Sequence, residues 1–377
     1  MRIQVVEDLR ESRAVLKVIG VGGAGGNAIN RMAEAGVQGV ELIAANSDAQ
    51  DLRRSQAQVR LQLGEKLTKG LGVGGDAARG REAALESEDQ IREVLTGSDL
   101  VFITAGMGGG TGTGGAPVVA KIAKDLQILT VGVVTRPFEF EKLNRAAIAE
   151  QGIQEMRQYV DTLLVIPNER LLDIIETDTT TETAFRLADD VLRKSVQSIS
   201  DVITTPGEIN MDLNDIRAIM KGAGEAMIGM AEASGPGRAL KAAKAAVQSP
   251  LLENVVIDGA KGLIVNITGR KNTLKLAEIE EVMGVIGGAA SPDAKIKNGH
   301  AYDESLGDAI RITVIATGFP PRRGGRSLLR AGLRARPAAG EGPRLEEAYD
   351  AQAALGTAAP EDWMKPAFLR LKVRKLK

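Results

Sequence analysis

The sequence contains no cysteine and only one histidine, His300. Disulfides, thiolate zinc sites and cysteine nucleophiles are therefore excluded. A Ser-His-Asp triad away from His300 and a site built from several histidines are excluded as well. Any chemistry carried out by this chain must use carboxylates, backbone amides and a hard metal ion.

Strong charge of one sign and long apolar runs are also missing. The 48 basic and 49 acidic residues leave a net charge of -1, which gives no global field to attract a polyanion. We therefore expect no nucleic-acid partner. No stretch approaches the roughly 20 apolar residues of a membrane span, and residues 1–10 alternate charged and apolar types. The sequence predicts a soluble, unexported protein.

At 377 residues, the chain exceeds the roughly 250–300 residues that one core serves, so two globular units and a tail are expected. Apolar, β-branched runs predict buried strands at 14–20, 40–45, 100–104, 128–134 and 162–166. Helix-period segments separate these runs, as in an α/β domain with a parallel sheet. Ligands of such sheets bind at the carboxyl ends of the strands.

A helix of about 20 residues is predicted from Thr181 to Ser200. A second α/β unit is predicted over about 210–318, with helices at 238–247 and 274–286 and strands at 262–268 and 309–317. Beyond Phe319 the composition changes to Pro, Gly, Ala and Arg, with six arginines between 322 and 336, which predicts a flexible linker. The last residues, EDWMKPAFLRLKVRKLK, indicate either a segment that folds on a partner or a solvated tail.

The first glycine-rich segment is GVGGAGGN, from Gly20 to Asn27, between a predicted strand and a predicted helix. Glycines there let backbone N–H groups approach a phosphate at a helix N-terminus. The segment also fits the dinucleotide pattern G-x-G-x-x-G, with Glu41 or Asp48 as a ribose partner. An NAD-dependent oxidoreductase is therefore an open alternative at this point.

The second segment, GMGGGTGTGG from Gly106 to Gly115, has seven glycines in ten residues. Ordering so many glycines is costly in backbone entropy, and a nest of amides around phosphate oxygens explains them better than a simple turn. Pro117 is expected in the first turn of the following helix. Two such loops indicate a polyphosphate held from two sides, and the P-loop pattern G-x-x-x-x-G-K-[ST] is missing.

The third candidate is NMDLND, from Asn210 to Asp215. Asp212 and Asp215 are three residues apart and face the same way at a helix start. Helix capping and catalysis explain the two acids equally well at this level.

GGGTGTG, from Gly108 to Gly114, resembles the tubulin signature. The flanking VIGVGGAGGNAINRM and ITAGMGGGTGTGGAPVVA resemble the FtsZ family, the bacterial tubulin-like cell-division GTPases. The resemblance runs from about Ala14 to Phe319 and resumes at the C-terminus. It implies a tubulin/FtsZ-like fold: a Rossmann-like parallel-sheet GTPase domain, a long connecting helix, a second smaller α/β domain and a disordered tail.

The implied domains are an N-terminal extension at 1–13, a GTP-binding domain at 14–178, a connecting helix at 179–203, a C-terminal GTPase-activating domain at 204–319, a disordered linker at 320–360 and a partner-binding peptide at 361–377. The implied ligands are GTP or GDP with Mg²⁺. The implied nucleotide-binding residues are Gly22, Gly23, Asn27, Asn46, Gly72, Gly74, Gly75, Gly108, Gly109, Gly110, Thr111, Gly112, Thr113, Glu141, Arg145, Asn168, Phe185 and Asp189.

Asp189 has a direct physical rationale, because a carboxylate accepts hydrogen bonds from the N1–H and N2–H₂ donors of guanine, and adenine has no such pair. Phe185 lies one helical turn earlier and offers a stacking surface. From Phe185 to Asp201 the helix spans about 24 Å, so the acids beyond it are far from their own nucleotide. Asn210, Asp212 and Asp215 are therefore expected to act on the nucleotide of the next subunit in an open, head-to-tail filament.

By resemblance, the filament is the bacterial cytokinetic ring scaffold, cytoplasmic and located at the division site. Membrane-anchoring and regulatory division proteins are expected to bind residues 361–377, so that contact with the membrane is indirect. Two alternatives stay open: an NAD-dependent oxidoreductase, which does not explain Gly106 to Gly115, and a nucleotide-binding filament protein without turnover, which does not need Asp212 and Asp215.

Overall fold

The structure is a computed structural model that describes residues 14–141, 143–173, 179–204, 211–252 and 257–319. The predicted N-terminal extension, linker and C-terminal peptide lie outside these residues, and so does Asn210. Among the described residues, no helix has both the length and the apolar character needed to cross a bilayer.

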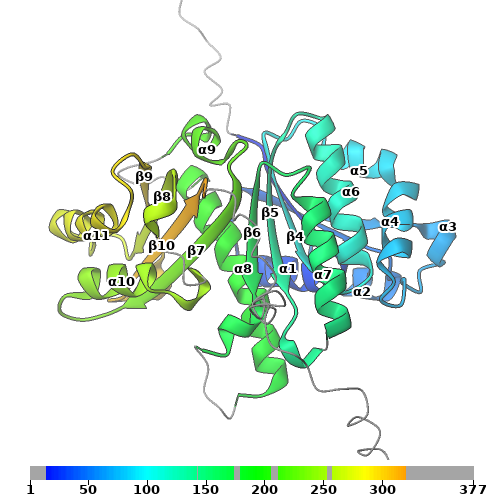
Figure 1. Ribbon diagram of the computed structural model, residues 1–377, viewed down its shortest axis with the longest axis horizontal. Coiled ribbons are helices and arrows are strands. Elements are labelled where there is room, and N and C mark those ends of the chain that lie inside the picture. Colours follow the sequence, from blue (N-terminus) through cyan, green and yellow to red (C-terminus); the bar gives the residue numbers. More distant parts are fainter. Residues whose placement is uncertain (1–13, 142, 174–178, 205–210, 253–256, 320–377) are drawn as a thin grey trace, which may run out of the picture. The chain divides into compact units, whose positions relative to one another are not determined.

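One mixed sheet runs through the described residues (Figure 1). Its strands are β1 Leu16–Val21, β2 Val40–Asn46, β3 Val59–Gln62, β4 Leu100–Gly106, β5 Leu129–Arg136, β6 Thr162–Pro167, β7 Gly224–Ala233, β8 Gly262–Gly269, β9 Lys295–Tyr302 and β10 Ile310–Thr317. Their order across the sheet is β3-β2-β1-β4-β5-β6-β7-β10-β8-β9.

The relative direction of neighbouring strands changes in the second half of the sheet. Neighbouring strands from β3 to β7 are parallel, whereas β10 is antiparallel to both β7 and β8. Strands β6 and β7 pair only over Thr162–Leu164 and Gly224–Ala226. The two predicted α/β units are therefore joined through a narrow seam in one sheet.

The helices are α1 Gly22–Glu34, α2 Ala49–Arg54, α3 Glu65–Thr68, α4 Ala77–Glu86, α5 Glu88–Leu95, α6 Thr111–Asp125, α7 Leu143–Met156, α8 Thr181–Thr204, α9 Leu213–Met220, α10 Arg238–Val247 and α11 Leu276–Ala289. Short 3-10 helices cover η1 Glu139–Glu141, η2 Asn168–Leu171, η3 Pro250–Leu252, η4 Ile257–Gly259 and η5 Glu304–Leu306. In Figure 1, α10 and α11 lie beside β7 to β10, and α4 to α7 lie beside the parallel strands.

Strand β4 shows why the parallel strands read as continuous apolar runs. Leu100 and Phe102 belong to the apolar cluster under α1 and α8, whereas Val101 and Ile103 belong to the cluster on the opposite face, under α6 and α7. Successive side chains of a strand point to opposite faces, and both faces of this sheet are covered, so Leu100 to Ile103 are all apolar.

Helix α8 confirms the predicted long helix and extends it to Thr204. Its buried side chains recur every three or four residues, including Ala184, Ala188, Val191, Ser195 and Ile199. This stripe packs in the same apolar cluster as Phe102 of β4 and Ile264 of β8. The helix thus braces both halves of the sheet.

Candidate functional site

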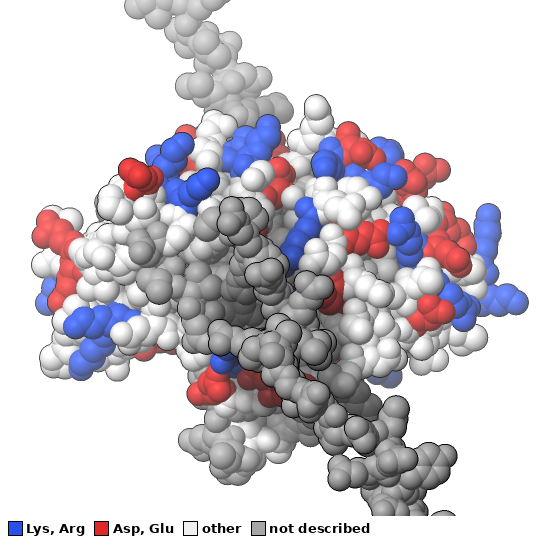
Figure 2. Space-filling view, viewed as in Figure 1, with Lys and Arg blue, Asp and Glu red and all other residues white. Residues whose placement is uncertain are grey.

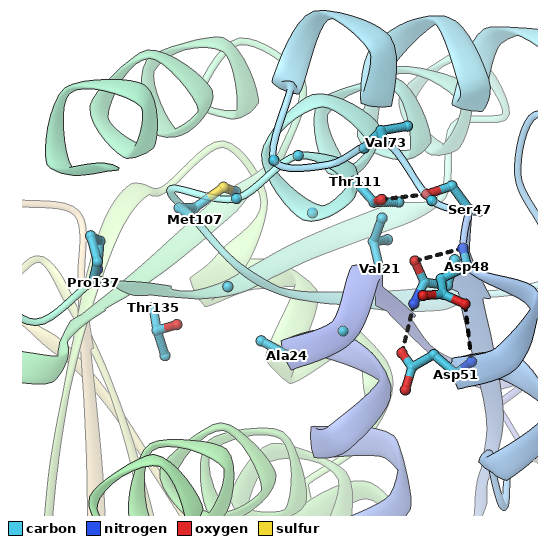
Figure 3. A pocket seen from close by; sticks show the side chains of 18 of the residues that line it. Val21, Ala24, Ser47, Asp48, Asp51, Val73, Met107, Thr111, Thr135 and Pro137 are labelled. Carbon is cyan, nitrogen blue, oxygen red and sulfur yellow. Dashed lines mark hydrogen bonds between the residues drawn. The ribbon is translucent and has the colours of Figure 1, made fainter. Parts of the chain in front are cut away.

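A cavity of about 630 Å³ opens at the carboxyl ends of the parallel strands. Each of the strands β1, β2, β4, β5 and β6 supplies a lining residue at or next to its carboxyl end, namely Val21, Asn46, Gly106, Thr135 and Asn168. The cavity lies at the edge where the α/β pattern predicts a ligand, because chain reversals after parallel strands leave a crevice there. Figure 3 labels Val21 and Thr135 among the side chains that line the cavity.

In the first glycine segment, some glycines are required by close packing, whereas another faces the cavity. A Cβ on Gly20 would stand 2.3 Å from the carbonyl oxygen of Gly25, and one on Gly25 would stand 2.6 Å from that of Thr104. These two glycines allow α1 to approach the sheet. Gly23 lines the cavity, and the nearest atom to a Cβ there is an Asp51 oxygen at 3.9 Å. Packing does not explain Gly23, whereas a ligand approaching its backbone does.

The second segment divides in the same way. Cβ atoms on Gly110 and Gly114 would stand 2.5 Å from Val73 Cγ2 and 2.0 Å from the carbonyl oxygen of Ala77, so these glycines serve contacts with α4 and the loop before it. At Gly109 the nearest atom is a guanidinium nitrogen of Arg145 at 3.9 Å, which leaves its backbone open to the cavity. The amide-nest interpretation therefore does not account for all seven glycines.

One expectation for this segment is wrong. Helix α6 begins at Thr111, so Pro117 lies inside the helix and not in its first turn. The low helix propensity of glycine concealed the true start. The hydroxyl of Thr113, within that first turn, accepts a hydrogen bond from the Gly108 N–H at 2.9 Å and so fixes the loop.

Polar side chains after β2 tie the two sides of the cavity together. The hydroxyls of Ser47 and Thr111 are 2.6 Å apart, and Asn46 Nδ2 donates to Asp51 Oδ2 at 2.6 Å (Figure 3). Asp48 Oδ1 accepts from the backbone N–H of Gln50 at 2.8 Å and caps α2. Sequence reasoning named Asn46 as a nucleotide ligand and Asp48 only as a ribose partner of a dinucleotide. Asp48, three residues after the predicted strand 40–45, is a residue type that favours helix caps, and this was the available signal.

The loop from Gly72 to Gly75 closes another side of the cavity. Gly72, Gly74 and Gly75 have φ of +76°, +61° and +84°, a region that L-residues with a Cβ rarely adopt. No atom lies within 4 Å of a Cβ built on Gly74 or Gly75. Backbone conformation, and not crowding, requires glycine at both positions.

Three of the chain's six phenylalanines gather at one end of the cavity. The rings of Phe138 and Phe185 meet edge to face with centroids 5.4 Å apart, and Phe140 stacks on Phe138 at 5.1 Å. Phe185 lines the cavity and is 41% exposed. Its apolar face is held in place by the other two rings and is available to a planar ligand.

Two polar groups lie at the same end. Asn168 is buried, and its Oδ1 accepts no hydrogen bond from the described residues. A buried acceptor without a donor is unfavourable, so this atom calls for a ligand that donates. Asp189 of α8 is partly buried, and burial raises the pKa of its carboxyl to about 7, although the positive charge of Arg31 acts in the opposite direction.

Between the aromatic end and the second glycine loop, Glu141 and Arg145 form an ion pair of 2.7 Å. Glu141 also accepts from the backbone N–H of Phe138 at 2.9 Å. Arg145 Nε donates to the carbonyl oxygen of Gly108 at 3.2 Å, which holds the cation over the second loop. A guanidinium so placed suits an anionic ligand.

Most of the predicted nucleotide-binding residues do line this one cavity: Gly23, Asn46, Gly72, Gly74, Gly75, Gly109, Gly110, Thr111, Gly112, Glu141, Arg145, Asn168, Phe185 and Asp189. Four do not, namely Gly22, Asn27, Gly108 and Thr113. Gly22 packs against Gly112 N, which a Cβ would meet at 2.7 Å, and the side chain of Asn27 is exposed on α1.

The predicted catalytic acids lie elsewhere. Asp212 caps α9 by accepting from the Asp215 N–H at 2.7 Å, so the capping explanation is correct for its geometry. Neither acid lines the cavity. From Asp189 at the cavity to Thr204 at the end of α8 the helix rises about 22 Å, and α9 follows beyond that end (Figure 1).

Glu41 does not fit the ribose partner of a dinucleotide. It stands at the amino end of β2, whereas the cavity lies at the carboxyl end, and its carboxylate pairs with Lys17 Nζ at 3.2 Å. Among the described residues, no group of three or more Asp, Glu, His or Cys side chains is arranged to hold a metal ion. The carboxylates that line the cavity are those of Asp48, Asp51, Glu141 and Asp189, and an Asp51 oxygen would lie 3.9 Å from a Cβ on Gly23 in the first glycine loop.

Comparison with known proteins finds two family matches. Residues 15–176 match the Tubulin/FtsZ family, GTPase domain, and residues 224–320 match the FtsZ family, C-terminal domain. An FtsZ dimer from M. jannaschii, solved empty, is 43% identical over 82% of this chain and 90% of its own, with a TM-score of 0.79.

Two more distant structures share the fold. CetZ1 from Haloferax volcanii, a GDP-bound monomer, is 24% identical over 81% of this chain and 95% of its own, with a TM-score of 0.69. CetZ2 from the same organism, a GTPγS-bound protofilament, is 19% identical over 90% of this chain and 100% of its own, with a TM-score of 0.67.

Proposed function

The chain belongs to the Tubulin/FtsZ family, and on this premise we propose that it binds GTP, assembles head to tail into filaments and hydrolyses GTP where two subunits meet. The observation that supports the proposal is a separation within the fold. One cavity has an aromatic end and an end lined by glycine loops, whereas Asp212 and Asp215 lie beyond the far end of α8, which rises about 22 Å from Asp189 to Thr204.

The cavity suits a guanine nucleotide. The ring of Phe185 stacks on the base, Asp189 accepts from its N1–H and N2–H₂ groups, and Asn168 Oδ1 takes a further donor. The open backbone at Gly23 and Gly109 receives the phosphates, with Arg145 beside them. Phosphate binding at a helix N-terminus uses N–H groups that have no partner within the helix.

Hydrolysis in this proposal depends on positioning and charge stabilisation. Asp212 is exposed and Asp215 is partly exposed on α9, so both can meet another subunit. There they orient the water that attacks the γ-phosphate of the neighbour's GTP. A contact between two different surfaces that does not close on itself produces an open filament.

We include Mg²⁺ as the metal bound with the nucleotide. When bound, Mg²⁺ would neutralise charge on the phosphates, and one or two carboxylates of the chain would suffice to hold it. Asp48 and Asp51 fit this small donor set, and Asp51 is already oriented by Asn46. A site held mainly by the substrate's phosphates needs no larger cluster of acids.

For the cell, we propose that the filaments form the cytokinetic ring at the division site in the cytoplasm. Residues 361–377 bind membrane-anchoring and regulatory division proteins, so the membrane is reached indirectly. On the face seen in Figure 2, basic and acidic side chains of the described residues are interspersed, which favours no polyanion there.

The decisive experiment measures phosphate release and light scattering on addition of GTP over a dilution series. If active sites are shared, GTPase activity per molecule must rise once the protein concentration exceeds the threshold for assembly. Activity that stays flat across dilution, with scattering present, contradicts the shared site. Scattering without phosphate release supports the second candidate function, a filament protein without turnover.

Base selection is tested separately. Asp189→Ala removes the acceptor for the guanine edge, and we expect GTP affinity to fall by about 1.5–3 kcal/mol, the contribution of a charged hydrogen bond. The preference for GTP over ATP should weaken with it. An unchanged preference in competition binding would remove Asp189 from the base site.

A further inference from the structure

The carboxylate of Asp215 has a cationic partner on another element. Lys297 Nζ of β9 lies 2.6 Å from Asp215 Oδ1, with the two side chains 46% and 33% exposed. Building on the proposed function, we infer that Lys297 is a positioning residue of the shared active site: its ammonium group holds the Asp215 carboxylate in the orientation that it needs at the neighbouring nucleotide.

A glycine at position 299 allows β9 to bring Lys297 close to Asp215. Lys297 and Gly299 are two apart on β9, so they point to the same face of the strand. A Cβ on Gly299 would stand 2.5 Å from Val202 Cγ1 and 3.3 Å from Met211 Cε. Glycine therefore lets β9 lie against the end of α8 and against Met211, the residue just before Asp212. The amino end of β9 then reaches the first turn of α9.

The two acids need different support. Asp212 is already held, because its side chain caps α9 through the Asp215 N–H. The Asp215 carboxylate takes no part in that cap. Among the residues that the structure describes, its ionic or hydrogen-bonding partner is Lys297 alone. Without the lysine, rotation about the side-chain bonds would leave the carboxylate in several orientations, and few of these would suit a water beside a phosphate.

A simpler explanation exists for a lysine on β9. This strand is the last of the sheet, and lysines on edge strands commonly prevent edge-to-edge aggregation. Lys295 shares that setting: it lies on the same face, two residues earlier, and is exposed. Its side chain forms no ion pair or hydrogen bond with the described residues. Lys295 is therefore the matched control for edge protection.

The test compares Lys297→Met, Lys297→Arg and Lys295→Met in the full chain. GTP turnover is measured per assembled subunit, above the critical concentration of each variant, so that weaker assembly does not enter the rate. For Lys297→Met we expect kcat to fall about two- to fivefold, the rate equivalent of a partly exposed ion pair, with GTP affinity unchanged. Lys297→Arg should keep most of the rate, and Lys295→Met should keep all of it.

The Asp215→Asn background then distinguishes loss of the Lys297–Asp215 ion pair from a general effect of Lys297→Met on the protein. In that background, Lys297→Met should cause no further loss, because the carboxylate that it positions is gone. An equal loss in both backgrounds, an equal loss for Lys295→Met, or full activity of Lys297→Met would overturn the inference. If Asp215→Asn itself hydrolyses GTP at the parent rate, the proposed function fails; if only Lys297→Met does, the proposed function stands and the role of Lys297 fails.

Discussion

Protonation of Asp189 should be coupled to guanine-nucleotide binding near neutral pH. Burial raises the pKa of this carboxyl to about 7 in the ligand-free protein. The ionised carboxylate accepts both guanine donors, whereas the protonated form carries a hydrogen on one oxygen. Binding therefore selects the ionised form and releases a proton whenever the pH is near or below 7.

The size of the effect follows from the pKa. With a pKa of about 7, roughly one tenth of the Asp189 carboxyls are ionised at pH 6 and roughly nine tenths at pH 8. Nucleotide affinity should therefore rise about tenfold between these pH values, equivalent to ~1.4 kcal/mol.

The contribution of Asp189 to folding stability should fall as the pH rises, whereas nucleotide affinity should increase. The pKa of Asp189 is about 7 in the folded chain, against an ordinary value of 3.8, so between these pH values the folded state binds more protons than the unfolded state. The contribution of Asp189 to the free energy of unfolding therefore decreases as the pH rises from about 4 to about 7.

Calorimetric titration with GDP, which avoids turnover, is the appropriate assay, run in buffers of different ionisation enthalpy. Nucleotide phosphates also titrate in this range, and Asp189→Asn serves as the control because it keeps that contribution and removes the carboxyl. The variant should bind more weakly and lose the additional pH dependence. Identical pH dependence and proton release in the two proteins would refute the reasoning.

Three further predictions concern other parts of the chain. Asp212→Ala should bind GTP and assemble but hydrolyse slowly, and mixing it with a subunit altered within 108–112 should restore some phosphate release; no restoration would argue against a shared site. Deleting 361–377 should abolish co-sedimentation with membrane-anchoring division proteins and leave GTP turnover unchanged, whereas a marked fall in turnover would contradict separate modules. Gly114→Ala should lower the free energy of unfolding in urea by about 1–3 kcal/mol, because its Cβ would meet the Ala77 carbonyl oxygen at 2.0 Å; the control Gly284→Ala, in a helix with open space around it, should stabilise by about 0.5–1 kcal/mol.

Local patterns of apolar residues made the central strands and α8 predictable. Strands such as β4 are buried on both faces, and the stripe on α8 recurs at the helical period, so each leaves a local pattern. The short strand β3, the strand β7 and the edge strand β9 were not predicted. β9 begins Lys-Ile-Lys-Asn at the sheet margin, where hydrogen bonding to β8, and not apolar content, makes it a strand.

The sequence by itself determined the family, the glycine loops and the set of residues expected at the nucleotide, because these depend on residue type at fixed spacing. Only the tertiary structure decided which glycines face the cavity, as Gly23 and Gly109 do, and which serve packing, as Gly25 and Gly114 do. That distinction depends on which atoms stand near an absent Cβ, and those atoms belong to other elements. The pairing of Lys297 with Asp215 has the same origin: 82 positions separate them in the chain, and the close approach at Gly299 brings them to 2.6 Å.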